Sequence, residues 1–201
     1  SGRIADCTVA FVVLFMFLAV IYRSRDRAKL SAVATAGLFS AYVTAGFSML
    51  TLLAKQHEGA VGAVLAATVI LGAWAGDVGG WLFGITMGKH KLCPTISPKK
   101  TVEGLIGSLL ISEIAFVGIA FVSRLIIPAQ PLDWVVLAWI APFAAVFGLM
   151  GDLVASVLKR EHNVKDFGTI VVGHGGIMDR FDGVIMVSIL FFLVSRFTDF
   201  F

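Results

Sequence analysis

The sequence predicts an all-α fold, a polytopic bundle of about six transmembrane helices that forms one integral membrane domain over residues 1–201. Composition is the first observation: 58% of the 201 residues are hydrophobic, 14% are charged, and the mean hydropathy is +0.94. A soluble domain is about half apolar and about one quarter charged. The second observation is that the apolar residues fall in blocks of roughly 20, about the length of a helix that crosses the hydrocarbon core. The third is that basic residues gather in alternate loops between these blocks.

The apolar blocks are expected to be helices because lipid offers backbone groups no partner outside their own helix. The expected spans are residues 4–22, 31–54, 59–88, 104–127, 132–158 and 177–197. The first block is too long for the apolar part of a signal peptide and has no small-residue cleavage site before Arg23, so we interpret it as a span. Because the sequence begins at Ser1 rather than at Met, we expect a processed or shortened chain.

The basic residues predict the orientation of the bundle. The segments 23–30, 89–103 and 159–182 each carry four Lys or Arg residues, whereas the intervening loops carry Lys55 alone and then none. The positive-inside rule therefore places these three segments in the cytoplasm and both termini on the other side. The two longest polar segments share the cytoplasmic face, where we expect a polar cavity.

A glycine stripe runs along the third expected span. Its members, spaced four residues apart, are Gly72, Gly76, Gly80, Gly84 and Gly88. Small residues at this spacing allow two helices to approach closely, so the stripe predicts helix packing rather than a ligand site.

Four charged residues lie inside or near the ends of expected spans, namely Asp77, Glu113, Arg124 and Asp152. Each costs at least about 2.5–3.5 kcal/mol to insert, so each needs a partner, a cavity or a function. For Glu113 and Arg124 structure and function are equally good explanations, since Arg124 can reach outward and Glu113 can pair with a neighbouring helix. We interpret Asp77 and Asp152 as functional because both lie in the cytoplasmic halves of their spans.

The segment 151–182 contains the densest set of polar side chains. Asp152, Ser156, Lys159 and Arg160 follow each other at helical spacing and share one face. That face runs from a carboxylate inside the membrane to two cations at the water boundary. A deep carboxylate with shallow cations suits a metal ion that carries a phosphate.

A glycine-rich run and two further carboxylates follow. Lys165, Asp166 and Gly168 precede the run 173–176, whose backbone N–H groups can form a nest for an anion. Asp179 and Asp182 then lie three residues apart at the start of the last helix, where they can join Asp152. Hard oxygen ligands of this kind suit Mg²⁺.

Each of these features has a simpler explanation when taken alone. The cations can be a topology signal, Asp179 and Asp182 can be favourable charges at a helix N-terminus, and His174 can be a turn residue. A zinc site built from His162 and His174 is disfavoured, because no cysteine is nearby and oxygen donors dominate. Together, at one membrane face, the features favour a phosphate-and-metal site.

The same segment resembles the signature of the CDP-diacylglycerol synthase family, the phosphatidate cytidylyltransferases. The matching positions are Ser156, Lys159, Arg160, Lys165, Asp166, Gly168, His174, Gly175, Gly176, Asp179, Arg180 and Asp182. The chain departs from the signature at Val172, where Pro is usual, and at Gly183, where Ser is common. A second element, residues 97–104, is similar to the family's Ser-Pro-Lys-Lys-Thr-x-Glu-Gly motif. The resemblance covers residues 70–190, the expected catalytic core.

The resemblance implies the transfer of CMP from CTP to phosphatidic acid, giving CDP-diacylglycerol and pyrophosphate for phospholipid biosynthesis. It implies catalytic roles for Ser156, Lys159, Arg160, Lys165, Asp166, His174 and Arg180. It implies substrate-binding roles for Asp77, Ser97, Lys99, Lys100, Gly175 and Gly176. It implies Mg²⁺ as cofactor, held by Asp152 and Asp179, with Asp182 as a third ligand or as the group that orients them; whether a second cation binds is left open.

The implied partners are CTP, phosphatidic acid and the lipid bilayer, without nucleic acid, and a homodimer is left open. The expected location is a bacterial inner membrane, with the active site facing the cytoplasm. Two alternatives stay open from the residues. A related CTP-dependent polyprenol or phytol kinase uses the same substrate and metal logic but transfers a terminal phosphate. An ion-coupled transporter would use Asp77, Glu113 and Asp152 as an ion path, although no pair of broken, repeated spans supports it.

Overall fold

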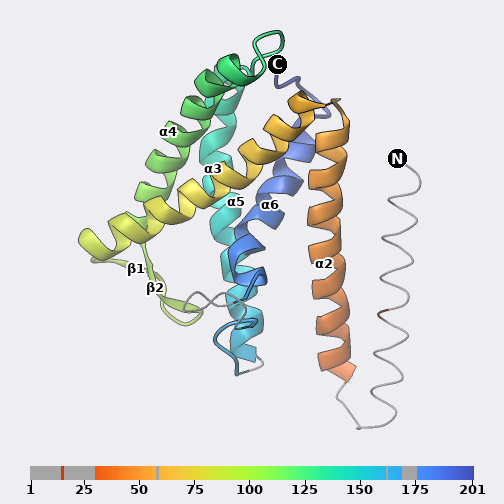
Figure 1. Cartoon of the computed structure of the whole chain (residues 1–201). Coiled ribbons are helices and arrows are strands. Elements are labelled where there is room, and N and C mark those ends of the chain that lie inside the picture. The colour runs from red at the N-terminus through yellow and green to blue at the C-terminus, as the bar shows by residue number, and fades with distance from the viewer. Residues whose placement is uncertain (1–14, 16–29, 58, 162, 169–175) are drawn as a thin grey trace.

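The computed structural model describes residues 15, 30–57, 59–161, 163–168 and 176–201, and it is a helical bundle with one small β-hairpin (Figure 1). The helices are α2 (Leu30–Lys55), α3 (Ala60–Thr86), α4 (Val102–Ile126), α5 (Trp134–Glu161) and α6 (Met178–Val194). The strands are β1 (Lys91–Cys93) and β2 (Ser97–Thr101). The expected helical architecture is therefore confirmed for the described part of the chain, and the hairpin is an addition to it.

Within the described residues, four helices are long and apolar enough to cross a membrane, judged by length and composition. These segments are Ala34–Lys55, Ala60–Thr86, Val102–Ile126 and Trp134–Glu161. α6 has 17 residues, fewer than the roughly 20 that span the hydrocarbon core without help. The expected span at residues 4–22 lies outside the described residues apart from Phe15, so the total of six stays a prediction.

The hairpin corrects the expectation of an irregular loop at residues 89–103. β1 and β2 pair antiparallel, with Lys91 opposite Thr101 and Cys93 opposite Ser97. Thr101 then caps α4, because its hydroxyl accepts a hydrogen bond from the Gly104 N–H at 3.1 Å. Pairing satisfies backbone groups that a free loop would leave to water. Such short, charged strands carry no alternation of apolar and polar residues, so their sequence gives no strand signal.

The glycine stripe of α3 packs against α4, as predicted. A methyl group built on Gly72 would lie 2.1 Å from the Phe116 ring, and one on Gly76 would lie 3.2 Å from the Ser108 hydroxyl oxygen. Gly79, beside the stripe, also faces α4, since a methyl group there would lie 2.5 Å from the Gly107 carbonyl oxygen. Nearer the hairpin, one on Gly80 would lie 3.6 Å from the Gly104 carbonyl oxygen. Absent side chains on α3 thus let the two helices touch along much of their length.

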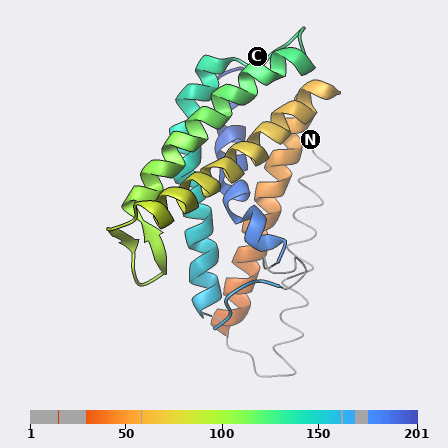
Figure 2. The same cartoon turned by 60° about the vertical axis from the view of Figure 1, so that its left-hand side comes forward.

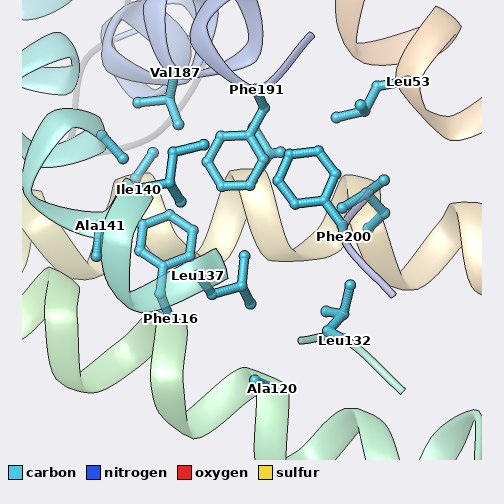
Figure 3. Close-up of a cluster of buried hydrophobic side chains, with 14 of the residues drawn as sticks. Leu53, Phe116, Ala120, Leu132, Leu137, Ile140, Ala141, Val187, Phe191 and Phe200 are labelled. Carbon is cyan, nitrogen blue, oxygen red and sulfur yellow. The ribbon is translucent and has the colours of Figure 1, made fainter. Parts of the chain in front are cut away.

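The apolar core lies toward the end of the bundle opposite the hairpin, where aromatic rings stack in a row (Figure 3). The Phe191 ring lies between those of Phe116 and Phe200, with centroids 5.4 and 5.3 Å away. The expected helix over 177–197 ends earlier, at Val194, because the chain turns to bury Phe200. The Phe200 carbonyl oxygen accepts a hydrogen bond from the Asp133 N–H at 2.7 Å, which fixes this turn.

The ends of the bundle separate the polar segments from the apolar core. The hairpin, the C-terminal end of α5 and the N-terminal ends of α2 and α6 lie at one end, and the C-terminus lies at the other (Figures 1 and 2). The described parts of two of the basic segments, 89–103 and 159–182, therefore lie at one end of the bundle, whereas the basic residues of 23–30 lie outside the described residues.

The α3–α4 contact predicts a sharp difference between two glycine substitutions. Gly79→Ala places its methyl group against a backbone oxygen that cannot move aside, so it should cost about 1–3 kcal/mol and lower the midpoint of thermal unfolding in detergent. Gly118→Ala, on α4, is the matched control, since its methyl group meets nothing within 4 Å and Ala is the better helix former. Equal midpoints for the two variants would contradict the proposed contact.

Candidate functional site

Three carboxylates from three helices come together at the hairpin end of the bundle. Asp77 on α3 and Asp182 on α6 both interact electrostatically with Asp152 on α5, and they also interact with each other. Asp182 is buried and Asp152 is half-buried. Asp77 is solvent-accessible. We call these three residues the carboxylate group.

A close approach of α5 and α6 positions two members of this group. A methyl group on Gly151 would lie 2.3 Å from the Asp182 carbonyl oxygen, and one on Gly183 would lie 3.3 Å from the Gly148 carbonyl oxygen. The helices therefore touch backbone to backbone next to Asp152. Glycine at position 183, a departure from the family signature, fits this contact without any shift of α5.

The hairpin supplies a cation to the carboxylate group. The Lys100 ammonium forms an ion pair with the Asp152 carboxylate, whose other oxygen lies 3.4 Å from the Ser156 hydroxyl. The charges of Lys100 and Arg180 also act on Asp77. The two polar segments identified in the sequence thus meet through a pair of opposite charges.

Asp179 lies in the first turn of α6 and makes a different set of contacts. Its Oδ1 accepts a hydrogen bond from the Lys159 ammonium at 2.8 Å, and its Oδ2 accepts one each from the backbone N–H groups of Phe167 and Gly176 at 2.9 Å. The two side chains of the ion pair are 13% and 8% exposed. Asp179 therefore joins α5 to the chain on both sides of residues 169–175.

The other expected site residues are less enclosed. Ser97 is half-buried, and the exposed ones are Lys99, Arg160, Lys165, Asp166 and Arg180. Gly176 is buried and donates to Asp179, whereas His174 and Gly175 lie outside the described residues. Of the two charges of uncertain role, Arg124 is exposed with its guanidinium 5.0 Å from the centre of the Phe121 ring, as expected for a side chain that reaches outward, and Glu113 is half-buried.

The family model of the cytidylyltransferases matches residues 2–198 of this chain. The chain belongs to the cytidylyltransferase family. Among similar proteins, the phosphatidate cytidylyltransferase of Bacillus subtilis (strain 168) is 44% identical over 126 residues, which are 62% of this chain and 45% of the relative. That of Staphylococcus saprophyticus is 39% identical over 173 residues, 86% of this chain and 63% of the relative. That of Staphylococcus aureus (strain COL) is 38% identical over the same shares. The chain thus spans 45–63% of the length of these curated relatives.

Glu103 holds the hairpin of this cytidylyltransferase chain in place, a role that the sequence analysis missed. Its carboxylate accepts hydrogen bonds from the N–H groups of Lys89 and His90, at 3.0 and 3.2 Å, and lies 2.6 Å from the His90 ring nitrogen Nδ1. The signal was present, because Glu103 follows the α4 cap by two residues, and acidic residues are favoured there.

Phe167 was also missed. Its ring stacks on Phe39 of α2 with centroids 5.4 Å apart, and the Lys159 ammonium lies 5.3 Å from its centre. No local pattern links residue 39 to residue 167, so only the tertiary structure reveals that α2 borders the site.

The donor set fits a hard divalent cation. Among the described residues no three carboxylate, imidazole or thiol groups converge closely enough to hold a metal ion as they stand. Mg²⁺ does not need three, since it usually takes one or two carboxylates and completes its shell with waters and phosphate oxygens. The Lys100 ammonium beside Asp152 shows that a positive charge is stabilised there.

The Lys159–Asp179 pair predicts the effect of removing one charge. Lys159→Met keeps the side-chain stem but leaves a buried carboxylate with two neutral donors, so it should cost about 3 kcal/mol, the lower end for a buried pair. Hydrogen exchange at the Phe167 amide should accelerate. Lys165→Met, at an exposed position, is the control. Indistinguishable exchange at Phe167 in the two variants would show that the pair does not hold this segment.

Proposed function

We propose that this protein transfers CMP from CTP to phosphatidic acid, forming CDP-diacylglycerol and pyrophosphate. The observation that carries the proposal is the carboxylate group, which lies beside Lys100, Lys159 and Arg180 at the hairpin end of the bundle. Carboxylates can bind a divalent metal ion, and the surrounding Lys and Arg side chains can bind phosphates. Together these groups suit a complex of a nucleotide with a metal ion. Membership of the family and the names of the relatives support the same reaction.

The reaction requires positioning more than acid–base chemistry. An oxygen of the lipid phosphate forms a bond to the α-phosphorus of CTP, and the bond from that phosphorus to the bridging oxygen of pyrophosphate breaks. The attacking oxygen is already anionic, so no strong base is needed. Rate enhancement then comes from alignment and from neutralising charge on phosphate oxygens.

Asp152 and Asp182 are the carboxylates that would hold Mg²⁺, because they adjoin at the α5–α6 contact. Bound there, Mg²⁺ would neutralise charge on the phosphate oxygens of the nucleotide. Ligation by Asp179, as the family resemblance implies, would require that its carboxylate exchange the Lys159 ammonium for the metal. In the structure the Asp179 carboxylate instead joins Lys159 of α5 to the backbone N–H of Phe167.

The Lys and Arg side chains of the site would bind the anionic substrates. Lys100 lies at the carboxylate group and Lys99 is exposed next to it, so the hairpin presents two ammonium groups to anionic substrates. Arg160, Lys165 and Arg180 would bind phosphates and the leaving pyrophosphate, Ser156 would line the site, and Asp166, His174, Gly175 and Gly176 would shape the anion-binding segment.

The membrane setting follows from the same arrangement. Asp77 is solvent-accessible and lies near the charges of Lys100, Asp152 and Arg180, which supports a polar cavity open at the hairpin end. With six spans and the basic segments inside, that end faces the cytoplasm, where CTP is available. The acyl chains of the lipid can stay in the bilayer. The relatives are bacterial, so we place the protein in a bacterial inner membrane.

Turnover of labelled CTP by the purified protein in detergent tests the proposal. With phosphatidic acid and Mg²⁺ we expect pyrophosphate and a CMP-containing lipid, and EDTA should stop both. Asp152→Asn should lower kcat by about 10²–10³-fold, as loss of a charge-stabilising group does, whereas Asp199→Asn, exposed near the C-terminus, should not. Release of CDP with a phosphorylated alcohol would identify a kinase instead. Translocation without nucleotide turnover, retained in Asp179→Ala, would identify a transporter.

The two adjacent lysines of the hairpin predict different kinetic effects. Lys99→Ala should raise KM several-fold with little change in kcat, because an exposed ammonium attracts substrate without touching the carboxylate group. Lys100→Ala should also lower kcat, because it leaves Asp152 without its cation. Lys91→Ala, exposed on β1, is the control. An unchanged KM with collapsed kcat in Lys99→Ala would contradict the assignment of Lys99.

A further inference from the structure

The hydroxyl of Tyr42 is buried and has no hydrogen-bond partner in the described part of the chain, a condition that it shares there only with the Ser112 hydroxyl. Tyr42 lies in the middle of α2, which the sequence analysis did not connect with any site. A buried hydroxyl without a partner is destabilising, and most buried polar groups in proteins are satisfied. This one therefore needs an explanation.

The position of Tyr42 indicates why its hydroxyl has no partner among the residues that the structure describes. Its hydroxyl lies within electrostatic range of the carboxyl group of Asp182 on α6, a helix that packs against α2. Its ring stacks on Phe39 with centroids 6.1 Å apart, and Phe39 stacks in turn on Phe167 of the signature segment. Tyr42 thus belongs to an aromatic row from α2 to Phe167, whose backbone N–H donates to Asp179.

Other hydroxyls on the same helix are satisfied locally. Those of Thr44 and Thr51 donate to carbonyl oxygens four residues earlier, at 2.7 and 2.8 Å. The Tyr42 hydroxyl stands at the far end of a rigid ring and cannot fold back onto its own helix in this way. Phenylalanine would fill the same volume without a polar atom to satisfy. The hydroxyl is therefore explained best by an acceptor that arrives with a ligand.

The groups around the Tyr42 hydroxyl indicate which kind of acceptor it would bind. Beside a carboxylate, a neutral donor is useful to an anion that shares the site, since a further carboxylate or a bare carbonyl would repel it. In the proposed reaction that anion is a phosphate. We infer that the Tyr42 hydroxyl donates a hydrogen bond to a phosphate oxygen of the substrate bound beside Asp182, so that α2 closes one side of the site. This inference rests on the proposed function.

Steady-state kinetics of Tyr42→Phe test it. The variant should lose about tenfold in kcat/KM, as expected when one hydrogen bond to a charged group is removed, while its midpoint of thermal unfolding stays the same or rises. KM is measured with CTP and with phosphatidic acid varied in turn. An effect confined to CTP assigns the bond to the nucleotide phosphate, and one confined to phosphatidic acid assigns it to the lipid headgroup.

Thr44→Val is the matched control, because it deletes a hydroxyl from the same helix whose bond is internal. It should leave kcat/KM unchanged. The inference is overturned if Tyr42→Phe keeps kcat/KM within twofold of the unmodified protein, or if its activity falls together with its unfolding midpoint. Failure of the proposed function looks different, since the unmodified protein would then not form a CMP-containing lipid at all.

Discussion

The backbones of α5 and α6 touch at Gly151 and Asp182, and this contact fixes both the fold at the hairpin end and the chemistry there. A side chain at Gly151 would force the helices apart. Because they meet, the Asp182 carboxyl group is brought beside that of Asp152, and Asp182 is buried. The Lys100 ammonium reaches from the hairpin to the Asp152 carboxylate and pairs with it. This ion pair therefore docks the hairpin onto α5 next to the contact between α5 and α6.

Stability alone does not account for this arrangement. Buried ion pairs are weak contributors to folding, because desolvation of both charges offsets their attraction, and apolar residues of similar size often do as well or better. At the opposite end of the bundle the helices are held by apolar packing instead, with the rings of Phe116, Phe191 and Phe200 stacked in a row. The chain packs rings at one end and keeps Asp77, Asp152 and Asp182 at the other, so the proposed function explains these carboxyl groups better than stability does.

Hydropathy and spacing predicted the parts of this structure that depend on burial. The ends of α2 to α5 lie within a few residues of the expected spans, and the glycine stripe packs as its period indicates. The sequence did not predict the features that depend on contacts between residues far apart in the chain. Nothing local shows that Phe200 returns to Phe191 and ends α6 early, or that Asp179 is surrounded by Lys159, Phe167 and Gly176. Spacing placed Asp179 and Asp182 on one face, but their three-residue separation puts them about 4.5 Å apart along the axis. Asp179 forms the ion pair with Lys159, whereas Asp182 lies beside Asp152.

The first turn of α6 is held from three sides, and this matters for a reaction that depends on placed charges. The Arg180 carbonyl oxygen accepts a hydrogen bond from the Trp74 indole of α3, and Phe181 packs on Trp74 and on Phe47 of α2. Asp182, the next residue, meets α5 at Gly151. Three successive residues therefore each contact a different set of neighbours, so α6 cannot rotate without breaking contacts to α2, α3 and α5. Electrostatic catalysis is effective when its charges are fixed before the substrate binds, since no energy is then spent on moving them. Rigid placement of Asp182 is what this packing provides.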